Sequence, residues 1–150
     1  TKLNNVLIDD TTGEGICVID LDTVMPGLSL YDVGDAVRST ANTAAEDEPD
    51  LSRVAVDLDM YESLVAGYLE AAGDLLKPLE IDLVPLASRL MTLECGIRFL
   101  TDHLHGDLYF HVGRPDHNLD RCRTQFRLVR DMEARRADME RVIERYRLSR

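Results

Sequence analysis

Three side chains with oxygen ligands flank two short apolar runs near the start of the chain. Asn5 comes directly before the run V-L-I, and Asp20 and Asp22 follow the run I-C-V-I. Gly13 and Gly15 lie between the runs, where a tight hairpin needs backbone conformations that glycine adopts easily. A hairpin would bring the three side chains together, and oxygen ligands suit Mg²⁺ or Mn²⁺ better than zinc.

Such a site fits a nucleotide, because Mg²⁺ takes only one or two carboxylates from the protein and leaves other positions to water and phosphate. Asn and Asp are also common turn formers. The spacing alone therefore leaves open whether these residues hold a metal or only shape turns.

Helical periodicity dominates the rest of the chain. Ser29 is the expected cap of the first helix, Gly73 is expected to end the second, and the polar run 40–50 predicts a mobile loop. Apolar residues recur at helical spacing in segments 31–38, 59–72, 83–104 and a long final one from Asp116 or Asn118 through Tyr146.

The expected fold is mainly α with one small β-hairpin, formed by residues 5–8 and 16–21, in a single domain spanning residues 1–150. A two-stranded ribbon is marginally stable alone. We therefore expect it to lie against the helices or against another part of the protein.

Composition narrows the class of protein. The 150 residues are 45% hydrophobic and 30% charged, with a net charge of −11, which argues against binding to nucleic acid. No apolar stretch approaches the roughly 20 residues that span a membrane. The three cysteines are widely spaced, so we expect reduced thiols packed in the core of a cytoplasmic protein.

The charge is unevenly distributed. Residues 1–119 hold 22 acids against 7 Lys and Arg, whereas residues 120–150 hold 6 acids against 10 Arg. An Arg-rich helix could contact an acidic partner. The interleaved acids favour the alternative, a solvated helix with ion pairs between residues three or four apart.

Several motifs resemble kinase-like phosphotransferases. T-K-L-N-N resembles the end of the catalytic loop D-x-K-x-x-N, with the base Asp expected directly before Thr1. V-I-D-L-D resembles the segment that supplies the second metal ligand, the counterpart of D-F-G in protein kinases. Y-D-V-G-D-A-V-R resembles a helix start in aminoglycoside phosphotransferase and choline kinase relatives.

The resemblance is greatest to bacterial N-acetylhexosamine 1-kinases, through V-I-D-L-D-T-V-M-P-G and E-C-G-I-R-F-L-T-D-H-L-H-G-D-L-Y-F. It implies the helical C-terminal lobe of the protein kinase-like fold, without the N-terminal lobe that covers ATP. The chain alone is then expected to be inactive, and its uncovered surfaces are expected to self-associate.

The resemblance also implies roles for residues at the hairpin. Asn5 and Asp20 would hold Mg²⁺ with ATP, and Lys2 would steady the transferring phosphate. Asp22 would support this site or contact substrate. Asp32 and Asp35 are expected to cap and brace the catalytic loop.

Arg98 and Tyr109 are implied to contact the sugar. Both side chains suit a sugar, because Arg offers several fixed hydrogen-bond donors and Tyr combines a ring face with a hydroxyl. Glu94, Arg98 and Asp102 also stand four residues apart, so an ion-pair ladder explains Arg98 equally well.

The sequence thus predicts part of an ATP- and Mg²⁺-dependent kinase that phosphorylates N-acetylhexosamine at the anomeric hydroxyl. An aminoglycoside- or choline-type kinase of the same fold is one alternative, because fold alone does not select the acceptor. A non-catalytic helical interaction domain is another.

Overall fold

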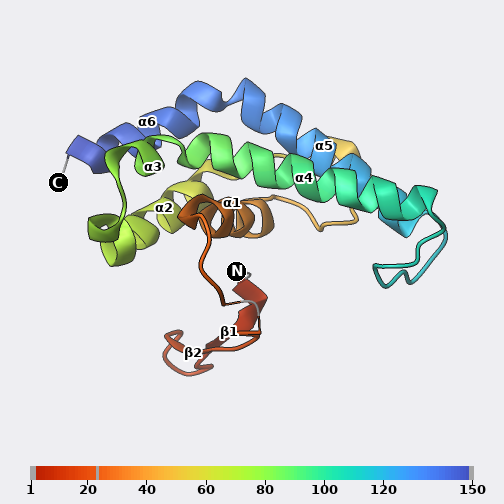
Figure 1. Cartoon of the computed structure of the whole chain (residues 1–150), viewed down its shortest axis with the longest axis horizontal. Coiled ribbons are helices and arrows are strands. Elements are labelled where there is room, and N and C mark those ends of the chain that lie inside the picture. The colour runs from red at the N-terminus through yellow and green to blue at the C-terminus, as the bar shows by residue number, and fades with distance from the viewer. Residues whose placement is uncertain (1–2, 23, 149–150) are drawn as a thin grey trace.

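The computed structural model of the chain describes residues 3–22 and 24–148. It confirms a mainly helical fold with one antiparallel hairpin. The helices form an elongated layer, and the hairpin lies to one side of it, beyond α1 (Figure 1). The elements are η1 (Leu3–Asn5), β1 (Val6–Ile8), β2 (Gly15–Val18), α1 (Ser29–Thr40), η2 (Leu51–Arg53), α2 (Leu58–Ala72), η3 (Gly73–Leu75), α3 (Pro78–Asp82), α4 (Val84–Leu104), α5 (His117–Ala134) and α6 (Arg136–Leu148).

The hairpin has a regular start and an irregular end. Val6 faces Val18 and Leu7 faces Cys17, and the register shifts before Ile8. In the connection, Gly13 has φ 73° and donates its N–H to the Asp9 carbonyl at 2.8 Å. All four residues of β2 are exposed. The hairpin therefore gains little from burial within the part of the chain that the structure describes.

The core lies between α1, α2, α4, α5 and α6. Its fully buried members include Val37, Val54, Tyr61, Leu128 and Met139. The three cysteines differ from the expectation that all are packed in the core. Cys122 is buried and Cys95 is partly buried, but Cys17 is exposed on β2. All three thiols are free, as expected for reduced cysteines.

Two glycines let α4 approach its neighbours closely. A Cβ on Gly34 of α1 would stand 2.7 Å from the Ala87 carbonyl oxygen of α4. A Cβ on Gly96 of α4 would stand 2.7 Å from the Phe126 ring of α5. Real side chains do not approach this closely, so both helix contacts require glycine as they stand.

The helix ends differ from the sequence prediction at two places. The expected single final helix is two, because the backbone breaks at Arg135 between α5 and α6. The break turns Met139 and Ile143 into the core. Ser29 does not cap α1: Leu28 holds the N-cap position, and the Ser29 hydroxyl donates to Glu80 at 2.9 Å.

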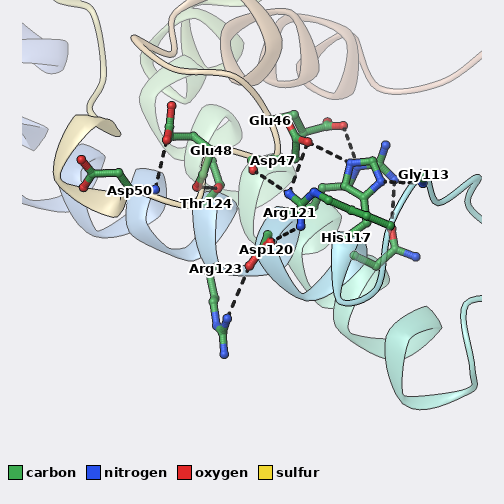
Figure 2. A network of polar contacts seen from close by, with 12 residues as sticks. Glu46, Asp47, Glu48, Asp50, Gly113, His117, Asp120, Arg121, Arg123 and Thr124 are labelled. Atoms are coloured by element: carbon green, nitrogen blue, oxygen red, sulfur yellow. Dashed lines mark hydrogen bonds and ion pairs between the residues drawn. The ribbon is translucent and has the colours of Figure 1, made fainter.

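The polar segment 41–50, here called the acidic loop, is anchored at several points, although the sequence predicts it to be mobile (Figure 2). Glu46 accepts from Arg38 at 2.9 Å and lies 3.8 Å from Arg121. Asp47 pairs with His117 at 3.0 Å. The Thr124 hydroxyl donates to the carbonyl of Glu48 at 3.0 Å. The acids that suggested mobility therefore hold the loop against α1 and α5.

Within the described ranges, no helix is both long enough and apolar enough to cross a membrane.

Candidate functional site

The hairpin brings two of the predicted metal ligands together. Asn5 ends η1 and Asp20 follows β2, and the Asn5 amide donates to Asp20 Oδ2 at 2.9 Å. The Asn5 carbonyl also accepts the N–H of Ile19 at 2.8 Å, which fixes the two ends of the hairpin. Asp20 has φ 60°, in the left-handed region that non-glycine residues seldom adopt.

The chemistry of this pair fits a hard cation. The Asn5 amide oxygen and the Asp20 carboxylate are the ligand types that Mg²⁺ prefers, and Asp20 is exposed, which leaves room for water and phosphate. Among the described residues, no three His, Cys, Asp or Glu side chains gather closely enough to enclose a metal. The pair therefore suits an open site completed by a ligand better than a closed structural site.

The other residues predicted for this site are placed differently. Asp22 is exposed and makes no hydrogen bond or ion pair with the residues that the structure describes. Lys2 lies outside the described residues. The Asp35 carboxylate pairs with Arg38 Nε at 2.7 Å.

A polar cleft of about 560 Å³ opens between α1, the acidic loop, α4 and the start of α5. We call it the α1–α4 cleft. Both signs of charge line it, in the side chains of Asp32, Asp35, Glu46, Glu94, Arg98 and Arg121. A lining with both donors and acceptors is suited to a polar ligand with many hydroxyl or amide groups.

Arg38 also lines this cleft and is only 5% exposed. Burial opposes its charge, but the Cys95 thiol, when ionised, and the carboxylates of Asp35 and Glu46 favour it and hold its pKa above the usual value. Because the carboxylates of Asp35 and Glu46 both pair with the Arg38 guanidinium, this buried charge has the partners that it needs. Arg38 therefore supports the cleft wall and neutralises two of its acids.

Cys95 is the thiol in this cleft, and it is not activated. Burial is the largest influence on the pKa of Cys95 and raises it. Arg38 acts in the opposite direction, but the pKa still reaches about 11. The nucleophilic form of a cysteine is the thiolate. Cys95 is therefore protonated at neutral pH and is not a nucleophile.

The structure brings the side chains of Arg98 and Tyr109 together. The Arg98 guanidinium lies 5.8 Å from the centre of the Tyr109 ring and 5.4 Å from that of Phe110. Both rings are within cation–π range. These residues line a hollow of about 390 Å³ that continues past the cleft, together with Thr101 and His105.

The predicted ion-pair ladder exists only in part. Glu94 Oε1 lies 3.7 Å from Arg98 Nε, with both side chains about half exposed, so the pair is weak. Asp102 is buried and turns away from this ladder. It accepts the N–H groups of Leu108, Tyr109 and Phe110, at 2.9, 2.8 and 2.9 Å.

Asp102 therefore fixes the turn that carries Tyr109. The Asn118 amide donates to the same carboxylate at 2.9 Å. Burial opposes the charge, but the backbone N–H groups outweigh it and hold the pKa of Asp102 below its usual value. Sequence reasoning missed this role, although the turn-forming H-G-D that follows Asp102 was a signal that the chain folds back there.

Arg121 is a second functional candidate that the sequence did not single out. Its guanidinium lies 5.4 Å from the Phe99 ring and donates to the His111 carbonyl and to Asn118 Oδ1, each at 3.0 Å. Its Nε is buried and has no hydrogen-bond partner among the described residues. Arg121 thus places a fixed cation on the wall of the α1–α4 cleft.

The Asn5–Asp20 pair lies close to the α1–α4 cleft. Asn4, the residue before Asn5, lines a hollow of about 260 Å³ together with Arg38 and Glu46, which also line the cleft. The start of the hairpin thus lies near two of the residues that line the cleft.

A model of the phosphotransferase enzyme family matches residues 1–80. The chain belongs to this family. The matched residues of this phosphotransferase include the Asn5–Asp20 pair, α1 with Asp35 and Arg38, and the acidic loop. Arg98 and Tyr109 lie beyond them. The family match therefore confirms the phosphotransferase part of the resemblance.

Proposed function

We propose that this phosphotransferase is a small-molecule kinase that uses ATP and Mg²⁺ to phosphorylate N-acetylhexosamine at its anomeric hydroxyl. The observation that carries the proposal is the Asn5–Asp20 contact, an oxygen-ligand pair set beside a polar cleft in a phosphotransferase family member.

The hairpin residues act on the phosphate side. By donating to Oδ2, the Asn5 amide orients the Asp20 carboxylate and leaves Oδ1 for a cation. The side-chain amide oxygen of Asn5 would be a second ligand. When bound, Mg²⁺ neutralises the charge that develops on the transferring phosphoryl group. Lys2 would steady that group from the same end of the chain.

The helical residues act on the acceptor side. Arg98 and Tyr109 stand together at the edge of the cleft, where they can donate to sugar hydroxyls and offer a ring face to the pyranose. Asp102 holds the Tyr109 turn in place. The proton of the attacking hydroxyl is accepted by the Asp expected directly before Thr1.

A cationic acceptor is the competing possibility, because aminoglycosides and choline carry positive charge. Asp32 and Glu94 would attract such a ligand, but Arg38 already neutralises Asp35 and Glu46. Arg98 and Arg121 add positive charge to the same walls. This balance favours a neutral acceptor rich in hydroxyl groups.

A phosphorylation assay tests the proposal in a polypeptide that extends N-terminal to Thr1. ADP release is measured with N-acetylhexosamines, choline and aminoglycosides, with and without Mg²⁺. We expect Mg²⁺-dependent turnover with the amino-sugars, and none from residues 1–150 alone, because positioning of ATP supplies most of the catalysis. Turnover with choline or an aminoglycoside only would overturn the acceptor assignment.

Sugar binding tests the acceptor residues separately. Arg98→Ala should weaken N-acetylhexosamine binding by about ten- to over a hundred-fold, because it removes a charged donor to a hydroxyl. Binding of Mg-nucleotide should not change. Arg130→Ala is the control, because Arg130 is exposed on α5, away from the residues that line the cleft. If Arg98→Ala binds sugar as tightly as the wild type, Arg98 does not contact the acceptor.

A further inference from the structure

The outer face of α4 carries an apolar stripe with coiled-coil spacing. The steps between its members are four, three, four, three and four residues, which is the 3.5-residue repeat of a heptad seam. Five members are 38–73% exposed and Leu100 is partly exposed. The α4 seam consists of Leu86, Leu90, Leu93, Ile97, Leu100 and Leu104.

The opposite face of α4 is already used. Ser88, Thr92 and Phe99 are buried on this face, and Gly96, on the flank of the seam, packs closely against the Phe126 ring of α5. α4 also packs against α1 and runs along the helical layer in Figure 1. The seam extends about 27 Å from Leu86 to Leu104 at the usual rise of a helix. It is therefore a long apolar ridge that points away from the core.

Charges flank the seam in a complementary pattern. With Leu90 and Ile97 at a positions and Leu93 at a d position, Arg89 falls at g and Glu94 at e. In parallel two-stranded packing, a g residue faces the e residue five positions later on the partner. Arg89 is partly exposed and makes no ion pair within the described part of the chain. Glu94 has only the weak contact with Arg98.

We infer that α4 is a dimer interface, in which the seams of two copies of this chain pack side by side and parallel. A twofold axis along the helices places Arg89 of each copy opposite Glu94 of the other, and the same d residue meets its own counterpart. Leu at the d positions, combined with the β-branched Ile97 at an a position, favours two strands. Since α1 and α5 already hold α4 in place, association carries no cost of forming the helix.

A second exposed surface competes for partners. The hairpin exposes Ile16, Val18 and Leu21, and its edge strands have unpaired backbone groups. It lacks a repeated spacing and a complementary pair of charges. The hairpin therefore serves as the matched comparison in the test.

Sedimentation equilibrium of the 150-residue chain at about 100 μM, where even weak interfaces are populated, gives the first result. We expect a dimer. Leu90→Glu and Ile97→Glu should each raise the dimer dissociation constant by at least about 100-fold, because each removes two buried apolar side chains per dimer. Ile16→Glu on the hairpin should leave the dimer intact. Circular dichroism checks that each variant keeps its helices.

Charge exchange tests the parallel orientation. Arg89→Glu and Glu94→Arg should each weaken the dimer, and the double variant should restore it, because the pair is re-formed between copies. In a Cys17→Ser background, Leu93→Cys should form a disulfide-linked dimer under oxidising conditions, because parallel packing places residue 93 next to its counterpart.

Three results would overturn the inference. These are a monomeric wild-type chain, a dimer lost on Ile16→Glu but kept on Leu90→Glu, and a double charge variant that remains weak. A monomer of a longer polypeptide that contains these residues would also overturn it, since another part of that polypeptide would then cover the seam.

Discussion

A single buried carboxylate organises the acceptor end of the molecule. Asp102 accepts three successive backbone N–H groups and so fixes Tyr109 and Phe110 beside Arg98. Because its folded pKa is lowered, its contribution to stability is present at neutral pH. That contribution is lost only as pH falls through the lowered pKa, below the usual range of an aspartate.

We expect Asp102→Asn to loosen this turn, because an amide replaces one acceptor oxygen with donors that face other donors. Amide hydrogen exchange at Leu108, Tyr109 and Phe110 should speed up at neutral pH, while exchange in α2 stays slow. Asp10→Asn, at an exposed position in the hairpin turn, is the control and should change neither. Unchanged exchange at the three amides in Asp102→Asn would show that the turn does not depend on this carboxylate.

Thiol reactivity tests the environment of the cleft. With a pKa of about 11, Cys95 should react slowly with iodoacetamide at pH 8, and its rate should rise as pH approaches that value. Cys17 is exposed and should be modified first. Mass spectrometry of the modified peptides measures both rates. Rapid modification of Cys95 at pH 7 would mean that burial does not protect this thiol.

The sequence predicts those side-chain contacts that depend on local pairing. Asn5 and Asp20 meet because a hairpin brings its two ends together, whatever the tertiary structure. Arg98 and Tyr109 were indicated by resemblance. The roles of Asp102 and Arg121 depend on the turn between α4 and α5, which a periodic pattern does not specify.

Helix contacts in this fold depend on two glycines, and a matched pair of variants tests one of them. Gly34→Ala should lower the free energy of unfolding by about 1–3 kcal/mol, because the new Cβ would meet the Ala87 carbonyl, which cannot easily move. Gly67→Ala should raise it by about 0.5–1 kcal/mol, because Gly67 lies within α2 and has no neighbour within 4 Å of a Cβ.

Urea denaturation of both variants gives the comparison. Both changes raise helix propensity equally, so only the α1–α4 contact distinguishes them. A Gly34→Ala protein as stable as Gly67→Ala would show that α1 can shift away from α4 without cost.

The helices themselves follow closely from periodicity. The predicted segments 59–72 and 83–104 are observed as Leu58–Ala72 and Val84–Leu104. The break at Arg135 was not predicted. Met139 and Ile143 keep the helical spacing whether the segment forms one helix or two. The anchoring of the acidic loop was also missed, because its partners on α5 lie about seventy residues away in the sequence.

Across the whole molecule, the uneven charge of the sequence is compensated by folding. Arginines of α6 pair with acids of α2 and α3, as Arg145 with Glu62 at 2.9 Å and Arg147 with Asp82 at 2.8 Å. Others pair within their own helix, as Arg136 with Glu140 at 2.7 Å. The Arg-rich segment therefore corresponds to the solvated, ion-paired alternative rather than to a uniformly basic surface.

The most direct test of the central claim is the turnover of Asp20→Asn in a polypeptide that extends N-terminal to Thr1. The amide keeps the shape of the side chain but loses the charge that would hold Mg²⁺. We expect turnover to fall by at least about 100-fold with sugar affinity nearly unchanged, because the lost stabilisation is felt mainly in the transition state. Asp10→Asn should retain full activity. An Asp20→Asn enzyme with wild-type turnover would contradict the assignment of the Asn5–Asp20 pair as the catalytic metal site.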